Sequence, residues 1–122
     1  MTDIKLGLVE AQFADIIWEH EPLTTKELVA LCEKELNWKR TTTYTVLKKL
    51  CNRGIFVTAD QKITSLLSKE EFHAIQSEHF VEQTFQGSLP AFLAAFTTRK
   101  TPTPEDLEQI RKLLASLGEK TL

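Results

Sequence analysis

The chain has 122 residues, of which 42% are hydrophobic, so it is long enough for one small domain, alone or with an accessory segment. Its apolar runs are far shorter than the roughly 20 residues of a membrane span, and its N-terminus lacks the layout of a secretion signal. We therefore expect a cytoplasmic protein with no membrane part. The formal net charge of −2 argues mildly against nucleic acid as a partner, because DNA-binding domains are usually basic.

The first predicted helix runs from about Leu8 to Glu19. Val9, Phe13 and Ile17 recur at the spacing of one helix face, together with Ile16, and we expect this stripe to be buried. The segment EPL then ends the helix.

The second helix has a clear beginning. Thr24 and Glu27 form a T-x-x-E capping box, and Leu23 and Leu28 stand on either side of it as a hydrophobic staple. The apolar face of this helix comprises Leu28, Leu31, Cys32 and Leu36.

The third helix, expected over residues 40–52, lies in the most basic part of the chain. Between Lys34 and Arg53 six basic residues stand against one acidic residue, a local net charge of +5, which is typical of an anion-binding face. Gly54 is placed to end this helix. At 100° per residue, the apolar side comprises Thr43, Val46, Leu47, Leu50 and Cys51. The opposite arc comprises Thr41, Tyr44, Thr45, Lys48, Lys49 and Asn52, with Thr42 at its edge.

Two short β-prone runs follow, IFVT and KITS, and residues 59–61 between them predict a small hairpin. Ser68 and Glu71 form another capping box, which opens a helix reaching about Phe85. Gly87 then breaks the helix.

Two further helices are predicted near the C-terminus. The run LPAFLAAF begins on Ser88, and the last helix begins with Thr103 as N-cap and Pro104 in its first turn. Leucine and isoleucine residues are spaced along the last helix like a dimer seam, and we expect Gly118 to end it. The seam comprises Leu107, Ile110, Leu114 and Leu117.

The order of these elements predicts a mostly α-helical fold with two parts. Residues 1–67 are expected to form a winged helix-turn-helix domain, in which two helices support a third and the hairpin is the wing. Residues 68–122 are expected to form a helical dimerisation region, because they carry more apolar surface than short helices can bury on themselves.

In such a fold, the polar arc of the third helix enters the major groove of DNA. Thr41 and Thr45 offer hydroxyl and methyl groups to base edges, and Arg40, Lys48 and Lys49 offer cations to phosphates or guanines. Tyr44 lies on the same arc and belongs to this candidate DNA-binding set.

The segment from Glu10 to Phe56 resembles the start of the penicillinase, methicillin-resistance and copper-transport repressor family. The matching features are Glu10 eight residues before Trp18, the PLTTKEL opening of the second helix, and Trp38 ahead of a TTxYTxLxxLxxxG helix. Further on, SLLSKEEF is similar to the segment that leaves the wing in this family, and GSLPAFLAAF with TPEDLEQIRKLL is similar to its dimerisation region. The resemblance covers nearly the whole chain.

The resemblance implies a homodimeric transcriptional repressor on double-stranded DNA, with each winged helix on one half of a dyad-symmetric promoter operator. The positions that it places against DNA are Arg40, Thr41, Thr42, Thr45 and Lys48, with Lys62 on the wing. The positions that it places in the dimer core are Phe92, Leu93, Phe96, Leu107, Ile110, Leu114 and Leu117. The family commonly has serine where this chain has Lys39, so we expect a less well capped third helix.

The resemblance also implies a way of relieving repression. In the β-lactam branch of the family, a membrane sensor system triggers cleavage of the repressor at an Asn-Phe-like bond within the dimerisation region. Ala95-Phe96 stands at that position here, with alanine in place of asparagine. The implied partner is a sensor-linked protease.

One alternative stays open, a winged-helix module that binds another protein instead of reading DNA. The first 67 residues carry nine basic and nine acidic residues, which agrees with such a module. The two interpretations differ in salt dependence, because binding through several cations releases counterions from DNA.

Other chemistry has little support in the sequence. His73 and His79 are six residues apart, on different sides of a helix, and no catalytic or phosphate-binding motif is present. We therefore expect no enzyme, no metal site and no cofactor. The cysteines and tryptophans are interpreted as packing residues, namely Cys32, Cys51, Trp18 and Trp38.

Overall fold

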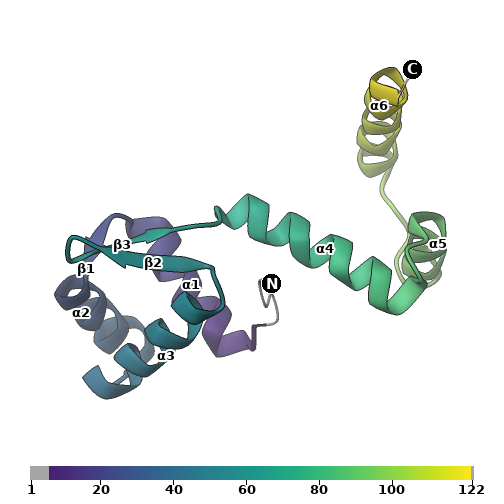
Figure 1. The fold of residues 1–122 in the computed structure, drawn as a ribbon. Helices are drawn as coiled ribbons and strands as arrows, with labels where there is room; N and C mark the ends of the chain where they lie inside the picture. The colour runs from purple at the N-terminus through teal and green to yellow at the C-terminus, as the bar shows by residue number, and fades with distance from the viewer. Residues whose placement is uncertain (1–5, 122) are drawn as a thin grey trace. The chain divides into compact units, whose positions relative to one another are not determined.

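The computed structural model describes residues 6–121, and over this range the chain forms six helices and one three-stranded antiparallel sheet (Figure 1). In chain order the elements are α1 (Leu8–His20), β1 (Leu23–Thr24), α2 (Thr25–Leu36), α3 (Arg40–Asn52), β2 (Phe56–Ala59), β3 (Lys62–Ser65), α4 (Lys69–Phe85), α5 (Leu89–Arg99) and α6 (Pro104–Thr121). They divide into two compact units, one ending at His79 and the other beginning at Phe80. The predicted fold, a winged helix followed by further helices, is confirmed.

The first unit has a closed apolar core made by α1, α2, α3 and the sheet. In α1, Phe13, Ile16 and Ile17 are buried as predicted. Val9 is 48% exposed, so the prediction that it belongs to the buried stripe is wrong. Val9 lies in the first turn of α1, one helical turn ahead of the residues that pack on the core. The remaining core residues are Ala14, Leu23, Leu28, Cys32, Leu47, Leu50, Ile55, Phe56, Ile63 and Phe72.

The capping box at the start of α2 is confirmed. Thr24 Oγ1 accepts a hydrogen bond of 3.1 Å from the backbone N–H of Glu27, and the Glu27 carboxylate accepts one of 3.0 Å from the N–H of Thr24. Leu23 and Leu28 are both buried beside it, as a hydrophobic staple requires. The beginning of α2 is therefore determined locally.

Gly54 ends α3 as predicted. Its φ of +82° lies in the left-handed region, where glycine is favoured. The N–H of Gly54 donates to the carbonyl of Cys51, and the N–H of Ile55 donates to that of Leu50, which is a Schellman motif. This turn brings Ile55 into the core and starts the wing.

The sheet has the order β1-β3-β2, and β2 with β3 forms the predicted hairpin. The prediction that residues 59–61 form its turn is wrong at Ala59, which pairs with Lys62 in the strand register. The turn consists of Asp60 and Gln61 alone, with φ of +53° and +63°. Two consecutive left-handed residues form the type I′ turn that matches strand twist, here without glycine.

Strand β1 was not predicted from the sequence. It is two residues long, and Leu23 pairs with Ile63 of β3. Leu23 therefore serves both the hydrophobic staple of α2 and the sheet, and it ties the wing to the helical core.

Helix α4 begins in the first unit with the predicted capping box, formed by Ser68 and Glu71 at 2.9 and 3.0 Å. Phe72, in its first turn, is buried, and its ring centroid lies 5.6 Å from that of Trp18. The start of α4 is thus packed on the core of the first unit.

The second unit contains the end of α4, α5 and α6. Phe80, Phe85 and Phe92 contact one another edge to face, with ring centroids 5.8–6.1 Å apart. The N-caps predicted for α5 and α6 are both present, since Ser88 accepts from the N–H of Ala91 and Thr103 accepts from that of Asp106.

The prediction that Gly118 ends the last helix is wrong. Helix α6 continues through Gly118 to Thr121. Glycine costs a helix about 1 kcal/mol relative to alanine, and this cost alone does not end a helix when Glu119 and Lys120, both good helix formers, follow.

Among the described residues, no helix combines the length and the apolar character that crossing a bilayer requires.

Candidate nucleic-acid interface

Helix α3 has one face on the core and one face in solvent. Thr43 is fully buried, and its hydroxyl donates to the carbonyl of Lys39 at 3.3 Å, so this threonine is structural. Lys39 is the N-cap and makes no side-chain cap, as expected. The seven α3 residues predicted to bind DNA are all exposed, namely Arg40, Thr41, Thr42, Tyr44, Thr45, Lys48 and Lys49. The fold therefore brings them together on the solvent side of one helix.

The hydroxyl of Thr45 has a defined orientation. It donates to the carbonyl of Thr41 at 2.9 Å, so its proton is used within the helix. Its oxygen keeps lone pairs for an outside donor. In this geometry Thr45 can accept from the amino group of adenine or cytosine, and its methyl group can contact a thymine methyl.

Arg40 and Tyr44 form a pair one helical turn apart. The guanidinium carbon of Arg40 lies 5.4 Å from the centre of the Tyr44 ring, and an Arg40 Nη donates to the tyrosine oxygen at 3.3 Å. Stacking restricts the rotamers of a long side chain, which lowers the entropy cost of a later contact. Tyr44 thus positions Arg40 at the N-terminal end of α3.

The two consecutive lysines of α3 have different surroundings. Lys49 Nζ lies 2.8 Å from Glu10 Oε2 of α1. Among the described residues, no ion pair is found for Lys48, which is exposed. The structure thus groups Lys48 with the threonines and ties Lys49 to α1.

Glu10 was used in the sequence only as part of a family pattern, and its contacts with α3 were not predicted. Its carboxylate also accepts from the N–H of Gly7 at 3.1 Å and lies 3.7 Å from Arg53 Nη1. The hydrogen bond from Lys49 and that from Gly7 lower the pKa of Glu10, against an opposing effect of burial. No local signal could have revealed this cluster, because Glu10 and Lys49 are far apart in the chain.

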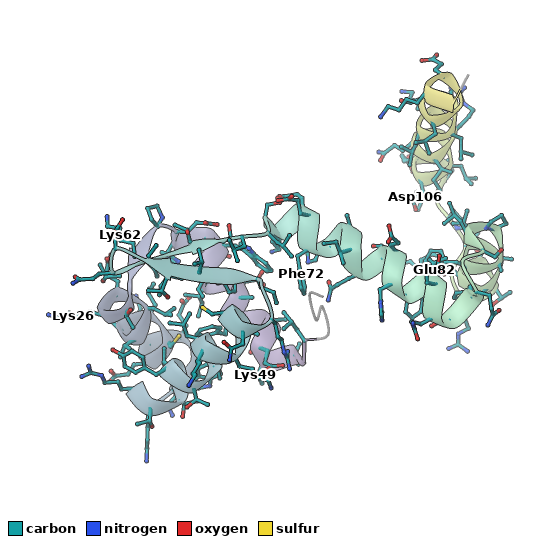
Figure 2. The ribbon with its side chains drawn as sticks, viewed as in Figure 1. Lys26, Lys49, Lys62, Phe72, Glu82 and Asp106 are labelled. Carbon is teal, nitrogen blue, oxygen red and sulfur yellow. The ribbon has the colours of Figure 1, made fainter. Side chains whose placement is uncertain are left out.

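Lys62, the predicted wing residue, is exposed at the start of β3 (Figure 2). The wing is hydrogen-bonded to Glu21, which follows α1. The Glu21 carboxylate accepts from the N–H of Ser65 at 2.9 Å and from the Ser65 hydroxyl at 2.8 Å. This brace joins the end of α1 to the end of β3 and was missed, because its partners are far apart in sequence. It places the strand that carries Lys62.

Both tryptophans pack as predicted. Trp38 stacks on Phe13, with centroids 5.4 Å apart and planes 20° from parallel. The indole N–H of Trp18 donates to the carbonyl of Leu67 at 3.0 Å, and its ring contacts Phe56 and Phe72. The two rings therefore pack on the core of the first unit.

An open groove of about 560 Å³ separates α3 from β2. Its walls are mostly apolar, and they comprise Tyr44, Leu47, Lys48, Cys51, Phe56, Val57, Thr58 and Leu66. Burial raises the pKa of the Cys51 thiol, as it does for Cys32 in the core, so both stay protonated and act as packing groups.

The residues predicted for the dimer core lie in α5 and α6 and are mostly exposed. Phe92 and Ile110 are half-buried, whereas Leu93, Phe96, Leu107, Leu114 and Leu117 are exposed. Leu113, which was not among the residues predicted for the dimer core, is 57% exposed and precedes Leu114 in α6. A groove of about 670 Å³ between α5 and α6 is lined by Phe92, Leu93, Phe96, Ile110 and Leu113, among others. Ala95 and Phe96, the predicted cleavage position, lie in the middle of α5.

Residues able to hold a metal ion are not gathered in the described part of the chain, where no group of three or more histidine, cysteine, aspartate or glutamate residues has the necessary geometry. The Nδ1 atom of His20 lies 2.9 Å from the carbonyl of Ile16 and is part of the end of α1.

Comparison with known proteins gives two findings. A family model described as penicillinase repressor matches residues 6–116. The penicillinase repressor of Bacillus licheniformis is 20% identical over 114 residues, which cover 86% of this chain and 85% of that protein.

Proposed function

The chain belongs to the penicillinase repressor family, a family of transcriptional repressors and not of enzymes, and on this premise we propose that it binds a dyad-symmetric promoter operator as a homodimer. In this proposal α3 of each protomer enters the major groove and reads one half-site. Helices α5 and α6 join the two protomers.

The observation that carries the proposal is the arrangement on α3. Thr41 and Thr45 are exposed at the middle of the solvent face, and Arg40 and Lys48 flank them. Short hydroxyl side chains allow the helix to approach base edges, and the cations on either side reach phosphates or guanines. The proposed DNA-binding set is Arg40, Thr41, Thr42, Tyr44, Thr45 and Lys48, with Lys62 of the wing. Lys49 is left out of this set because its ammonium group is bound to Glu10.

The proposed contribution of the wing is small. Lys62 is the basic residue of the β2–β3 hairpin, and Asp60 lies beside it in the turn. The net charge of the hairpin is therefore close to zero, and most of the attraction to phosphates comes from α3.

The proposed dimer rests on the exposed apolar surface of the second unit. Helix α5 has no buried residue, and α6 exposes Leu107, Leu113, Leu114 and Leu117. Burying one leucine stabilises an assembly by about 1.5–3 kcal/mol, so leaving this face in water is costly. A second copy of the chain would cover it and fill the groove between α5 and α6, in a self-complementary interface.

We further propose that loss of the dimer relieves repression. A cut between Ala95 and Phe96 would divide α5 and separate α6 from the DNA-binding unit. The carbonyl of Ala95 accepts from the hydroxyl of Thr98 at 2.7 Å, so α5 must open locally before a sensor-linked protease can reach the bond. Half-sites would then be bound singly, without the gain from joint binding.

Substitution of the threonines tests base reading by α3. Thr41→Ala and Thr45→Ala should each reduce the preference for a duplex of the chain's own promoter over a scrambled duplex, because one good base contact is worth about 1–3 kcal/mol. Fluorescence anisotropy competition between the two duplexes measures this preference. Ser77→Ala is the matched control, since the Ser77 hydroxyl also donates to a carbonyl four residues back, at 2.9 Å, but on α4. Unchanged preference in both threonine variants would assign the interface to another surface and would favour the protein-binding alternative.

A further inference from the structure

We propose that Glu10 limits the affinity of α3 for DNA by holding the ammonium group of Lys49 in an ion pair. This inference rests on the proposed function, because it concerns the cations of the same helix. It assigns a role in affinity to a residue of α1 that does not itself contact DNA.

Lys48 and Lys49 differ in their ion pairing although they are neighbours on α3. They are consecutive, so they project about 100° apart, on either side of the arc that carries Thr41 and Thr45. Both side chains are exposed, and each could reach a phosphate by length alone. Only Lys49 has a carboxylate at 2.8 Å among the described residues. Of these two lysines of α3, Lys48 is therefore available to a phosphate, whereas Lys49 is held by Glu10.

The Glu10–Lys49 pair is expected to persist beside DNA because Glu10 is held in place. The side chain of Glu10 is only 19% exposed, and it is fixed by the N–H of Gly7 as well as by Lys49. It cannot follow Lys49 outward without losing the cap of α1. If Lys49 left, a partly desolvated carboxylate would lose its closest cation and keep Arg53 at 3.7 Å. Removing one partner of a partly buried pair costs more than removing one at the surface.

The ion pair reduces the number of cations that α3 offers to DNA. A lysine that stays on Glu10 neutralises no phosphate, so it releases no counterion. The missing phosphate contact lowers affinity and reduces its dependence on salt. A repressor that must leave its operator gains from a limit of this kind, since weaker binding favours release when the dimer is lost.

The experiment uses the full chain and four variants. Glu10→Gln removes the charge but keeps an oxygen that can cap α1, because glutamine also serves in capping boxes. Lys49→Gln and the double variant show whether the effect passes through Lys49. Glu71→Gln is the matched control, since it removes the same charge from the same capping-box position, in α4. Anisotropy titrations with the promoter duplex and a scrambled duplex are made between about 50 and 200 mM salt, a range over which the Debye length falls roughly by half.

Among the variants, only Glu10→Gln is expected to have a steeper salt dependence than the parent, by about 0.9 in log Kd per log salt for each protomer. As salt rises over this fourfold range, the affinity of Glu10→Gln should therefore fall by about 3.5-fold more per protomer than that of the parent. The parent, Lys49→Gln, Glu71→Gln and the double variant should share one slope. The effect should be present on both duplexes, because phosphate contacts carry no sequence information.

Two results would overturn the inference. If Glu10→Gln keeps the parental slope while Lys49→Gln has a shallower one, Lys49 already binds a phosphate in the parent. That outcome leaves the proposed function standing. If neither duplex binds at 50 mM salt, the proposed function fails and the inference fails with it. If Glu10→Gln does not fold, the salt dependence of Lys49→Gln still tests the inference. A slope equal to that of the parent supports it, and a shallower slope overturns it.

Discussion

The two units of the chain differ in how they satisfy their apolar side chains. Every buried hydrophobic residue of the described chain lies at or before Phe72, in the first unit. In the second unit, α5 buries none, and α6 leaves a row of leucines exposed. The first unit therefore has a complete apolar core within one chain. The second unit has amphipathic helices whose apolar faces are exposed in the single chain. The proposed function assigns the presentation of α3 to the first unit and the binding of a second protomer to the second unit.

The largest expected effect comes from charging the exposed row of α6. Leu114→Asp should abolish the proposed dimer, because a carboxylate would be buried without a partner. Affinity for a two-half-site operator should then fall by about 10²–10⁴, the gain that joint binding gives. Sedimentation and anisotropy measure the two consequences.

The control for this variant is Lys112→Asp, which introduces the same side chain on the opposite side of α6 at 100° per residue. It should stay dimeric. A folded Leu114→Asp protein that remains dimeric would place the dimer interface outside the exposed leucine row of α6.

A change in the core of the first unit should affect stability and leave the second unit intact. Phe13→Ala removes a fully buried ring that stacks on Trp38, and it should lower the free energy of unfolding by about 3–5 kcal/mol. Urea unfolding followed by tryptophan fluorescence reports on the first unit, because both tryptophans of the chain lie in it. Val9→Ala, in the same helix, should change stability by less than about 0.5 kcal/mol, because Val9 is largely exposed. Equal effects of the two substitutions would contradict the core described here.

The elements that local rules govern could be predicted from the sequence. The capping boxes at Thr24 and Ser68 and the glycine end of α3 each depend on residues within five positions, and all three are present. Helix α6 shows where a local rule is too weak. Gly118 carries a helix-ending signal, but the cost of one glycine does not outweigh continued hydrogen bonding.

Contacts between distant segments could not be predicted. The pairing of Leu23 with Ile63, the brace from Glu21 to Ser65 and the ion pair of Glu10 with Lys49 each join parts of the chain that only the fold brings together. A two-residue strand has no periodicity to detect. For the candidate site, helical spacing identified the exposed face of α3 but gave no way to distinguish Lys48 from Lys49.

A smaller effect is expected from removing equivalent N-caps in the two units. Thr24→Ala should lower the free energy of unfolding of the first unit by about 1 kcal/mol, because the N–H of Glu27 loses its acceptor. Thr103→Ala should cost α6 a similar amount, with no change in the tryptophan-monitored transition and a weaker dimer in sedimentation. A shift of the tryptophan transition by Thr103→Ala would mean that the units do not unfold separately.

The smallest effect concerns acid. The pKa of Glu10 is lowered in the folded chain, so its contribution to stability is fully present above the unfolded value of 4.5 and is lost as the pH falls through the folded pKa. Glu10→Gln should therefore make the tryptophan-monitored stability less dependent on pH between about 5 and 3. Parallel pH profiles of the parent and the variant would contradict the ion-pair cluster at the start of α1.

DNA reading by α3 is tested by an anisotropy titration of the full chain with its own promoter duplex and with a scrambled duplex, at two salt concentrations. We expect tight binding that prefers the promoter and weakens steeply as salt rises, because Arg40 and Lys48 of α3 and Lys62 of the wing release counterions from DNA in both protomers. Equal and weak binding to both duplexes, with little dependence on salt, would contradict the assignment of α3 as a DNA-reading helix.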